Sequence, residues 1–204
     1  MRADLPLDLR EKYEKTPPLA MPILAKEPDV FPPDLLDSAQ AIEQPWWAIY
    51  TLARQEKKLM RLLAAAGAAF YSPIIPRRYR SPNGRVRTTY EPLFANYVFL
   101  CGDEAARHEA VCTGCVSRWL PVGQPLELVE DLRQLHSLIA LGAPLAPERR
   151  LEIGTKVRIR SGLFAGYEGV VFRRDNETRL QISVRFMDQG VSVAVEDCQV
   201  ERTS

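Results

Sequence analysis

The sequence predicts an α+β protein in which an antiparallel sheet flanked by helices precedes a small β-barrel. Between residues 45 and 142, strand-like and helix-like segments follow in the order strand, helix, strand, strand, helix, which favours helices packed against one sheet. Residues 151–204 hold several short alternating strands separated by glycine-containing turns, a pattern typical of small barrels. Residues 1–44 hold seven prolines and no sustained periodicity, so we expect a disordered, proline-rich acidic extension there.

The bulk composition is that of a globular protein. A chain of 204 residues fits one large or two small domains, and its contents of 46% hydrophobic and 26% charged residues are ordinary for soluble domains. It contains no apolar run of about 18 residues, and its first residues lack the apolar segment of a signal peptide. We therefore expect a cytoplasmic protein that makes no membrane contact.

Charge is distributed unevenly along the chain. Residues 1–44 carry five basic and nine acidic side chains, and residues 151–204 carry eight of each. Residues 54–90 carry nine basic side chains and one acid, Glu56. Such dense positive charge indicates a surface for nucleic acid or an acidic partner, although many basic faces are merely solvated.

The segment 46–67 is predicted to form a strand followed by a basic helix that ends at Gly67. The strand, 46–52, is rich in aromatic and branched residues. Helical spacing then puts apolar and basic side chains on different faces, which points one stripe at a core and the other outwards. The apolar stripe is Leu59, Leu62, Leu63 and Ala66, and the basic stripe is Arg54, Lys57, Lys58 and Arg61.

A basic hairpin and an apolar strand are predicted next. Residues 69–79 read as an extended segment, and the Asn-Gly pair at 83–84 favours a type I′ hairpin turn. Arginines crowd around its tip: Arg77, Arg78, Arg80, Arg85 and Arg87. We expect the hairpin and the basic helix to form one positive patch. The following strand, 91–100, has apolar residues on both faces, so either helices of the protein or a partner must cover it.

The remaining elements complete the predicted sandwich. Residues 104–111 suit a short helix, and 115–122 suit a strand. Leu128, Leu132, Leu135 and Ile139 support a second amphipathic helix that ends near Gly142. Prolines in 143–150 then favour a linker, so the expected domains are 45–142 and 151–204.

Catalysis finds little support in the sequence. His108 and His136 lie in no nucleophile motif, and no phosphate-binding loop or paired-carboxylate motif is present. Cys112 and Cys115 form a single C-x-x-C pair with His108 four residues before it, which leaves metal or redox chemistry conceivable but favours incidental cysteines. We therefore expect no enzyme activity, no cofactor and no bound metal.

Two stretches resemble a known family. The sequence IGTKVRIRSGLFAGYEGVV, 153–171, looks like a KOW motif, in which Gly154, Gly162, Phe164, Gly166, Gly169 and Val171 fit the pattern. The tryptophan-led strand, the RQEKK start of the basic helix and EPLFANYVFL resemble the N-terminal (NGN) domain of the NusG family of transcription elongation factors. The form PLF-x-NYVF is more similar to RfaH-like antiterminators than to general NusG, which usually has Pro-Gly at the positions of Ala95 and Asn96.

The resemblance implies a fold, a function and partners. It implies an NGN-like domain over 45–142 and an SH3-like KOW barrel over 151–204, in a bacterial antitermination factor expected to be a monomer. Tyr50, Phe94 and Tyr97 would then dock on the clamp helices of the RNA polymerase β′ subunit. The nine basic residues of 54–90 would contact upstream DNA or the non-template strand. In the barrel, Gly162, Phe164 and Gly166 would bind ribosomal protein uS10 or the termination factor Rho, with Phe164 projecting from an exposed turn.

Two other readings stay open. The chain is also compatible with a general NusG that aids Rho-dependent termination. A KOW-containing RNA-binding or ribosome-associated module would use the same basic residues to grip ribosomal RNA. Some RfaH-like proteins refold the C-terminal domain into a helical hairpin, but the strong strand alternation of 151–204 favours a stable barrel here.

Overall fold

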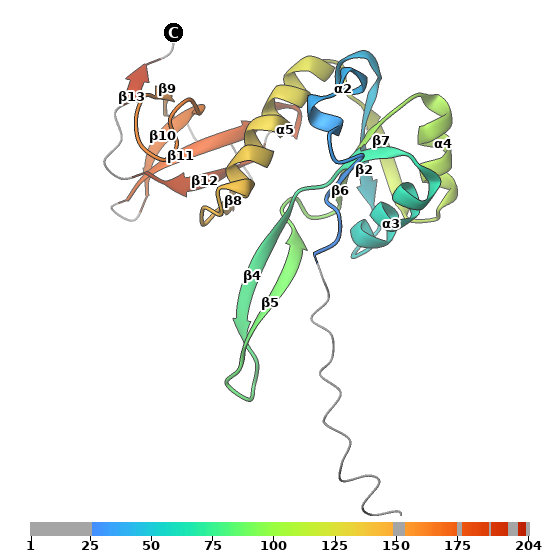
Figure 1. Ribbon diagram of the computed structural model, residues 1–204, viewed down its shortest axis with the longest axis horizontal. Helices are drawn as coiled ribbons and strands as arrows, with labels where there is room; N and C mark the ends of the chain where they lie inside the picture. The colour runs from blue at the N-terminus through green and yellow to red at the C-terminus, as the bar shows by residue number, and fades with distance from the viewer. Residues whose placement is uncertain (1–25, 149–153, 175–176, 188, 196–199, 203–204) are drawn as a thin grey trace, which may run out of the picture.

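The computed structural model describes residues 26–148, 154–174, 177–187, 189–195 and 200–202 (Figure 1). The helices are α2 (Ala39–Glu43), α3 (Glu56–Ala66), α4 (Glu104–Cys112) and α5 (Pro125–Ala140), with 3-10 turns η1 (Leu35–Asp37) and η2 (Arg185–Met187). The strands of the N-terminal part are β1 (Val30–Phe31), β2 (Trp46–Thr51), β3 (Ala69–Tyr71), β4 (Ile74–Arg80), β5 (Val86–Pro92), β6 (Tyr97–Cys101) and β7 (Val116–Pro121). Those of the C-terminal part are β8 (Ala146–Glu148), β9 (Thr155–Ile159), β10 (Glu168–Arg174), β11 (Glu177–Val184), β12 (Gln189–Ala194) and β13 (Val200–Arg202).

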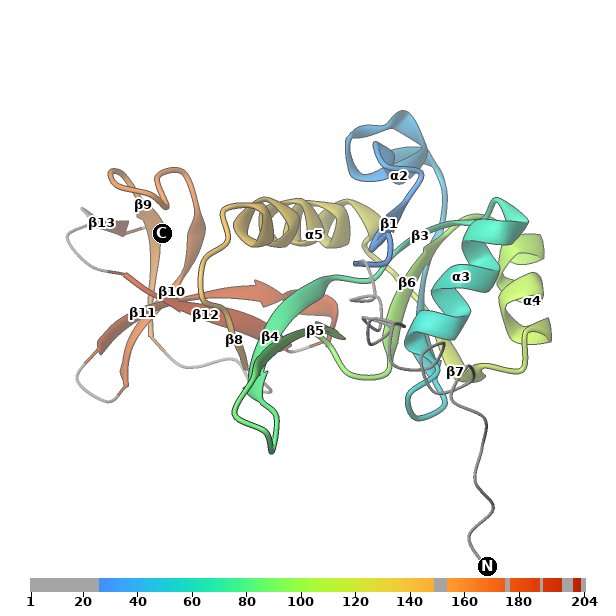
Figure 2. The same cartoon turned by 60° about the horizontal axis from the view of Figure 1, so that its bottom comes forward.

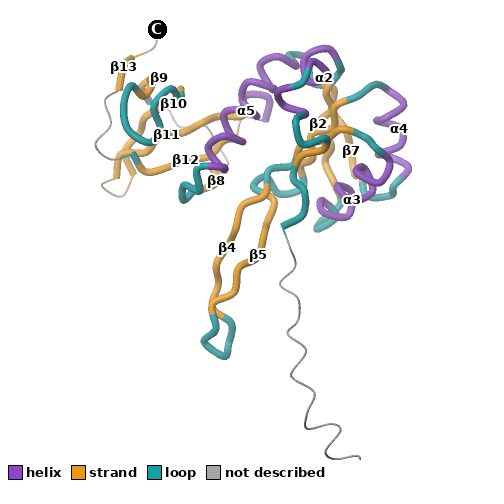
Figure 3. Tube along the Cα trace, viewed as in Figure 1, coloured by secondary structure: helices purple, strands orange, loops and turns teal. Residues whose placement is uncertain are grey.

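An antiparallel five-stranded sheet organises the N-terminal part, in the order β1-β3-β6-β2-β7. Its central strand β6 is apolar on both faces, and each face packs against a different hydrophobic core. Val98 and Leu100 share one core with Leu59 and Leu63 of α3. Phe99, which points the other way, belongs to a second core that includes the leucines of α5. The protein's own helices therefore cover most of this strand. Figure 3 shows the helices gathered around this sheet and the C-terminal part built chiefly of strands.

The predicted strand 91–100 is in fact two strands and a turn. β5 ends at Pro92 and β6 begins at Tyr97, because the chain turns between them with Asn96 in the left-handed region at φ 66°. The turn breaks the two-residue alternation, so Phe94 joins the same core as Phe99. Strict alternation along one strand 91–100 would put Phe94 and Phe99 on opposite faces, and the turn prevents this.

Helix α3 confirms the predicted helix, but its buried face differs from the predicted apolar stripe. Gly67 closes it at φ 73°, with its N–H donating to the Leu63 and Ala64 carbonyls. Met60 is buried beside Leu59 and Leu63, whereas Leu62 is 39% exposed. None of the helices in the described ranges is long and apolar enough to span a membrane.

Residues 29–43 are ordered, which corrects the prediction of disorder for this part of the extension; residues 1–25 lie outside the described ranges. β1 adds to the edge of the sheet beside β3, and the Phe31 ring stacks on Phe70. Leu35 and Leu36 are buried in the core that contains α5. The prolines did not prevent this segment from docking, because its apolar side chains pack against the sheet and the core that contains α5.

β4 and β5 form a separate two-stranded ribbon that stands out from the body of the molecule, and we refer to it as the arm (Figure 2). Its tip is closed by hydrogen bonds from the Gly84 N–H to the Ser81 carbonyl and from the Ser81 N–H to the Arg85 carbonyl. Gly84 has φ 75°, but Asn83 is not among the residues of positive φ. The hairpin is thus confirmed, whereas the type I′ turn is wrong, since that turn needs positive φ at both positions.

The C-terminal part is an antiparallel sheet in the order β13-β9-β10-β11-β12-β8. Its strands approach closely at two glycines, since a Cβ at Gly169 would lie 2.2 Å from the Gln181 carbonyl oxygen and one at Gly190 would lie 2.3 Å from that of Ile182. β8 falls inside the predicted linker 143–150 and pairs with β12. The segment is therefore partly built into this sheet instead of being only a tether.

Helix α5 joins the two parts. Buried α5 side chains such as Leu132 and Leu135 share one core with N-terminal Trp46 and with C-terminal Ile182. The linker prediction implied two parts that move independently, but here they pack against the same helix. The Gln134 Oε1 also accepts from the Glu168 N–H at 2.8 Å.

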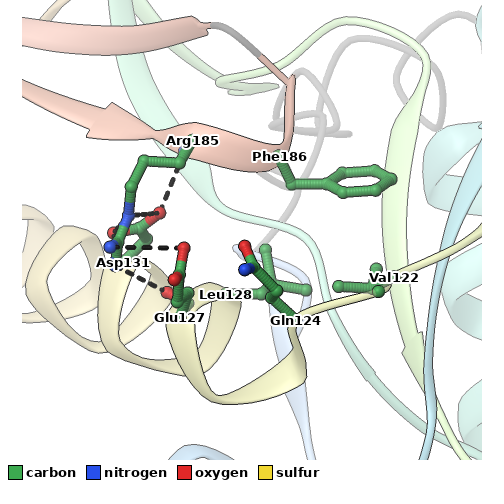
Figure 4. Close-up of a pocket in the computed structure, with 8 residues that line it drawn as sticks. Val122, Gln124, Glu127, Leu128, Asp131, Arg185 and Phe186 are labelled. Atoms are coloured by element: carbon green, nitrogen blue, oxygen red, sulfur yellow. Dashed lines mark hydrogen bonds and ion pairs between the residues drawn. The ribbon is translucent and has the colours of Figure 1, made fainter.

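An ion pair between Asp131, near the middle of α5, and Arg185 also holds this contact (Figure 4). Asp131 is 5% exposed and accepts from the Arg185 backbone N–H at 2.9 Å and from its guanidinium at 3.0–3.2 Å. Burial raises the pKa of Asp131, which the hydrogen bonds from Arg185 oppose. A cavity of about 300 Å³ lies alongside, lined in part by Val122, Leu128 and Phe186.

We expect Arg185→Ala to loosen the C-terminal sheet from α5, because it strands the buried Asp131 carboxylate. Charge-assisted hydrogen bonds contribute about 1.5–3 kcal/mol, and the half-exposed Arg185 side chain places its contribution toward the low end. Small-angle scattering should show a larger radius of gyration, and thermal unfolding should begin at a lower temperature. Arg160→Ala, which removes an exposed ion pair with Glu201, is the matched control and should change neither. Unchanged scattering and unfolding in Arg185→Ala would contradict the role of this ion pair.

Candidate functional site

The half-exposed end of the sheet carries an aromatic pair. Tyr50 at the end of β2 and Tyr97 at the start of β6 are cross-strand partners, and their ring centroids lie 5.2 Å apart at 81°. The Arg118 guanidinium carbon lies 4.6 Å from the Tyr50 ring centroid. Leu120, two residues along β7 on the same face, is 42% exposed. We call Tyr50, Tyr97, Arg118 and Leu120 the aromatic face.

Phe94 does not belong to this surface. Its side chain is 3% exposed and lies in the core that also contains Phe99 and Tyr71. The prediction that Phe94 docks a partner directly therefore conflicts with its burial, and Phe94 instead supports the turn from beneath. Tyr50 and Tyr97 are the two predicted docking residues that the structure brings together at the surface.

The turn before Tyr97 is held by a buried carboxylate. The Asn96 N–H donates to Oε1 of Glu56, the first residue of α3, at 2.8 Å. The Asn96 carbonyl accepts from the Thr51 N–H at 2.8 Å, and its side-chain amide reaches the Tyr50 hydroxyl at 3.5 Å. Because Glu56 is 8% exposed, this network ties the aromatic face to the start of the basic helix.

The basic residues near α3 form one positive region. Arg54 and Lys58 are exposed and Lys57 is half-buried. Arg61 is exposed as well, but its guanidinium pairs with Glu27 of the extension at 2.8 Å. The acidic extension thus already neutralises part of the predicted basic stripe.

The arm carries the other positive region. Its five arginines are all exposed: Arg77, Arg78, Arg80, Arg85 and Arg87. Figures 1 and 2 both show the tip of the arm well apart from α3. The single patch expected from the sequence is therefore two separate regions.

The C-terminal turn places its side chains differently from the expectation. Gly162 and Gly166 have φ of 89° and 92°, which allows the turn. Phe164 is only 9% exposed and packs edge-on against Tyr167, so the prediction that it projects into solvent is wrong. Leu163, its neighbour, is 65% exposed and is the apolar side chain that this turn presents.

The cysteines and histidines of the described ranges form no metal-binding cluster. Cys112 is exposed with its Sγ 3.6 Å from the His108 Nδ1, whereas Cys115 is buried. Within the described ranges, no three His, Cys, Asp or Glu side chains lie together as metal ligands would. Burial raises the pKa of the Cys101 thiol to about 12, which keeps it protonated and unreactive. His136 is half-buried, with its ring centroid 5.6 Å from that of Tyr71.

Sequence reasoning missed three residues of the site. Arg118 and Leu120 alternate on an exposed edge strand, and only the pairing of β7 with β2 reveals that they share a face with Tyr50. Glu56 could have been found, since it is the one acid within a basic segment and begins the helix. However, an acid at a helix start also interacts favourably with the helix dipole, so its position alone does not indicate that it holds the turn.

We expect Glu56→Ala to destabilise the protein by about 1–3 kcal/mol, because it leaves the Asn96 N–H without its charged acceptor. Urea unfolding of the full chain measures this change. Glu56→Gln, which retains an acceptor oxygen, should lose less than half as much. Equal losses for the two variants would mean that the contact with Asn96 contributes little.

A family model described as "NusG: Transcription termination factor nusG" matches residues 44–134, which is less than half of the 204 residues. No curated protein matches the chain. A chain of the "Crystal Structure of MjSpt4:Spt5 complex conformation B" is 18% identical with a TM-score of 0.25, and the match covers 78% of this chain and 97% of that one. A TM-score this low does not establish a shared fold. The segment that holds the aromatic face, α3 and the arm is thus similar to the NusG family, while the C-terminal sheet lies outside the family match.

Proposed function

We propose that the protein is a non-enzymatic transcription elongation factor that suppresses pausing or termination by binding the clamp helices of RNA polymerase. The observation that carries the proposal is the aromatic face, where Tyr50 and Tyr97 are half-exposed and fixed edge-to-face at 5.2 Å. Tyrosines with one wet and one packed end are frequent energetic centres of protein interfaces. The family match over residues 44–134 supports assigning this face to a polymerase contact.

The rigidity of the face favours a pre-organised contact. Asn96 links the Tyr50 hydroxyl to Glu56, and Arg118 lies over the Tyr50 ring. Side chains already held in place lose less conformational freedom on binding. The same face offers Leu120 as an apolar contact and Arg118 as a cation for an acidic helix surface.

The two positive regions supply the contact with nucleic acid. Arg54 and Lys58 near α3 are exposed, as are the arginines of the arm. These side chains would contact phosphates of the upstream DNA or of the non-template strand. Phosphate contacts give affinity and orientation without reading sequence. A factor that holds both the clamp and the DNA would favour the elongating conformation over the paused one, provided that it binds the former more tightly.

The C-terminal sheet, as an SH3-like KOW domain, would recruit a second partner such as ribosomal protein uS10 or Rho. Its turn presents Leu163, which is 65% exposed, while Phe164 supports the turn from inside. A second candidate function is support of Rho-dependent termination. The description of the matched family, which names a termination factor, favours it. The sign of the effect on transcript length separates the two functions.

Binding to purified RNA polymerase tests the aromatic face. We expect Tyr50→Ala with Tyr97→Ala to weaken binding at least about 30-fold, since truncating two interface anchors costs about 2 kcal/mol or more. The measurement is capture of polymerase by the tagged full-length protein across a concentration series. Tyr79→Ala, which removes an exposed tyrosine of the arm, is the matched control and should bind like the wild type.

Two results would overturn the proposal. If the wild type ignores polymerase but shifts structured RNA, the ribosome-associated reading replaces it. If the folded double variant still binds polymerase like the wild type, another surface makes the contact.

The C-terminal turn generates its own prediction. Leu163→Ser should leave thermal stability nearly unchanged, because its side chain is mostly solvent-exposed. Phe164→Ala should destabilise the chain by about 3–5 kcal/mol as a large buried side chain is lost. Differential scanning calorimetry compares the two. Similar losses for both would show that Phe164 is not the packed residue of the turn.

A further inference from the structure

The arm is long and thin enough to reach a ligand beyond the body of the protein. Between Ile74, which is fully buried, and Arg80 near the tip, the strand rises about 20 Å at roughly 3.4 Å per residue. Its two strands are joined only to each other in the sheet pairing. Figure 2 shows it standing clear of the N-terminal sheet.

Both faces of the arm carry arginines. Cross-strand partners share a face, so Arg77 and Arg87 lie on one face with Tyr79. Arg78 and Arg80 lie on the opposite face with Val86. Arg85 follows the tip, where its carbonyl accepts from the Ser81 N–H. At its base, Ile75 and Tyr90 pack against the body of the protein, but beyond them each face of the arm carries arginines.

The charge of the arm is almost uncompensated. Residues 74–92 hold five arginines and one acid, Glu91. Arg77 pairs with Glu91 at 3.0 Å near the base of the arm. Within the described part of the chain, Arg78, Arg80, Arg85 and Arg87 take part in none of the ion pairs. These four guanidinium groups are free to contact phosphates.

We propose that the arm inserts into the major groove of B-form duplex DNA and contacts the phosphate backbones on both sides of the groove at once. The groove is about 12 Å wide and admits a two-stranded ribbon. Inserted edge-on, the ribbon would turn one face toward each backbone. Arg87 and the Glu91-paired Arg77 lie on one face, and Arg78 and Arg80 lie on the other. The inference rests on the proposed function, in which the arm contacts DNA near the polymerase. It narrows that contact to the DNA duplex in place of a single strand.

The side chains argue against a single strand or an RNA duplex as the ligand. Proteins that bind single strands use several aromatic side chains as stacking platforms, whereas the outer arm exposes one, Tyr79. The major groove of A-form RNA is deep and narrow and does not admit such an element. The proposed contacts are to phosphates, which carry no direct sequence information, so we expect binding without strong sequence preference.

Fluorescence anisotropy with the full-length protein and no polymerase tests this inference. The probes are a 24-base-pair DNA duplex, one of its single strands and an RNA duplex of the same sequence. We expect the DNA duplex to bind at least about tenfold tighter than either other probe, with an affinity that falls steeply with salt. Methyl green, a major-groove ligand, should displace the protein, and netropsin, a minor-groove ligand, should not.

Variants of each face make the test specific. Arg77→Ala with Arg87→Ala should weaken duplex binding, and Arg78→Ala with Arg80→Ala should weaken it comparably. Each pair should reduce the magnitude of the salt slope by about 2, as expected for two lost phosphate contacts. Lys57→Ala with Lys58→Ala removes the same charge from α3 and should leave the preference for duplex over single strand intact.

Several outcomes would overturn the inference. These are equal or tighter binding to the single strand or RNA duplex, no detectable duplex binding, or an effect confined to one face of the arm. Because the assay contains no polymerase, such a result leaves the aromatic face and the proposed function standing. Loss of polymerase binding in the tyrosine variants would likewise leave the DNA result intact.

Discussion

The packing of helix α5 between two sheets is the constraint on which the rest of the structure depends. Its buried leucines belong to one continuous core that includes Trp46 and Phe99 on one side and Ile182 and Val193 on the other. The Asp131–Arg185 contact fixes the register of that packing near the middle of the helix. Hydrophobic burial holds the parts together but is non-directional. The ion pair, which requires a specific geometry, fixes one relative position of α5 and the C-terminal sheet.

This packing decides which surfaces remain for partners. With α3 and α4 on one face of the N-terminal sheet and α5 with the docked extension on the other, the middle of β6 is sealed. In the described N-terminal part, the strand ends that carry Tyr50 and Tyr97, the edge strand β7, the basic residues near α3 and the arm remain exposed for contacts. The acidic extension then reduces the charge near α3 through Glu27 and Arg61, which leaves the arm as the less neutralised of the two positive regions.

Local signals predicted much of the fold. Gly67 and Gly142 end helices where the sequence placed them, and the alternating strands of the C-terminal part appear as a sheet. The errors arose where tertiary contacts outweighed local pattern. Leu35 and Leu36 docked from a proline-rich segment, and Pro147 lies in a strand that pairs with β12, because both found partners that no local rule could supply. Asn96 shows the opposite case, since its left-handed conformation is expected for asparagine and broke the strand that alternation had favoured.

The candidate site was predicted in part. Tyr50 and Tyr97 contact each other at the surface, whereas Phe94 and Phe164 are buried. An aromatic residue in a turn can pack into the core under the turn as readily as it can project into solvent. Exposure depends on which residues the turn buries, and sequence spacing does not determine that. The separation of α3 from the arm was equally invisible, since two segments close in sequence leave the sheet in different directions.

The central claim is that the aromatic face is the surface that meets RNA polymerase. Its most direct test is a photo-crosslinking amino acid at position 120, on the same face as Tyr50 but outside the tyrosine pair. In a complex of the full-length protein with transcribing polymerase, the account predicts a crosslink to the clamp helices of the β′ subunit, mapped by mass spectrometry. A crosslink to RNA, to another subunit or to none, from a complex that has formed, would contradict the claim.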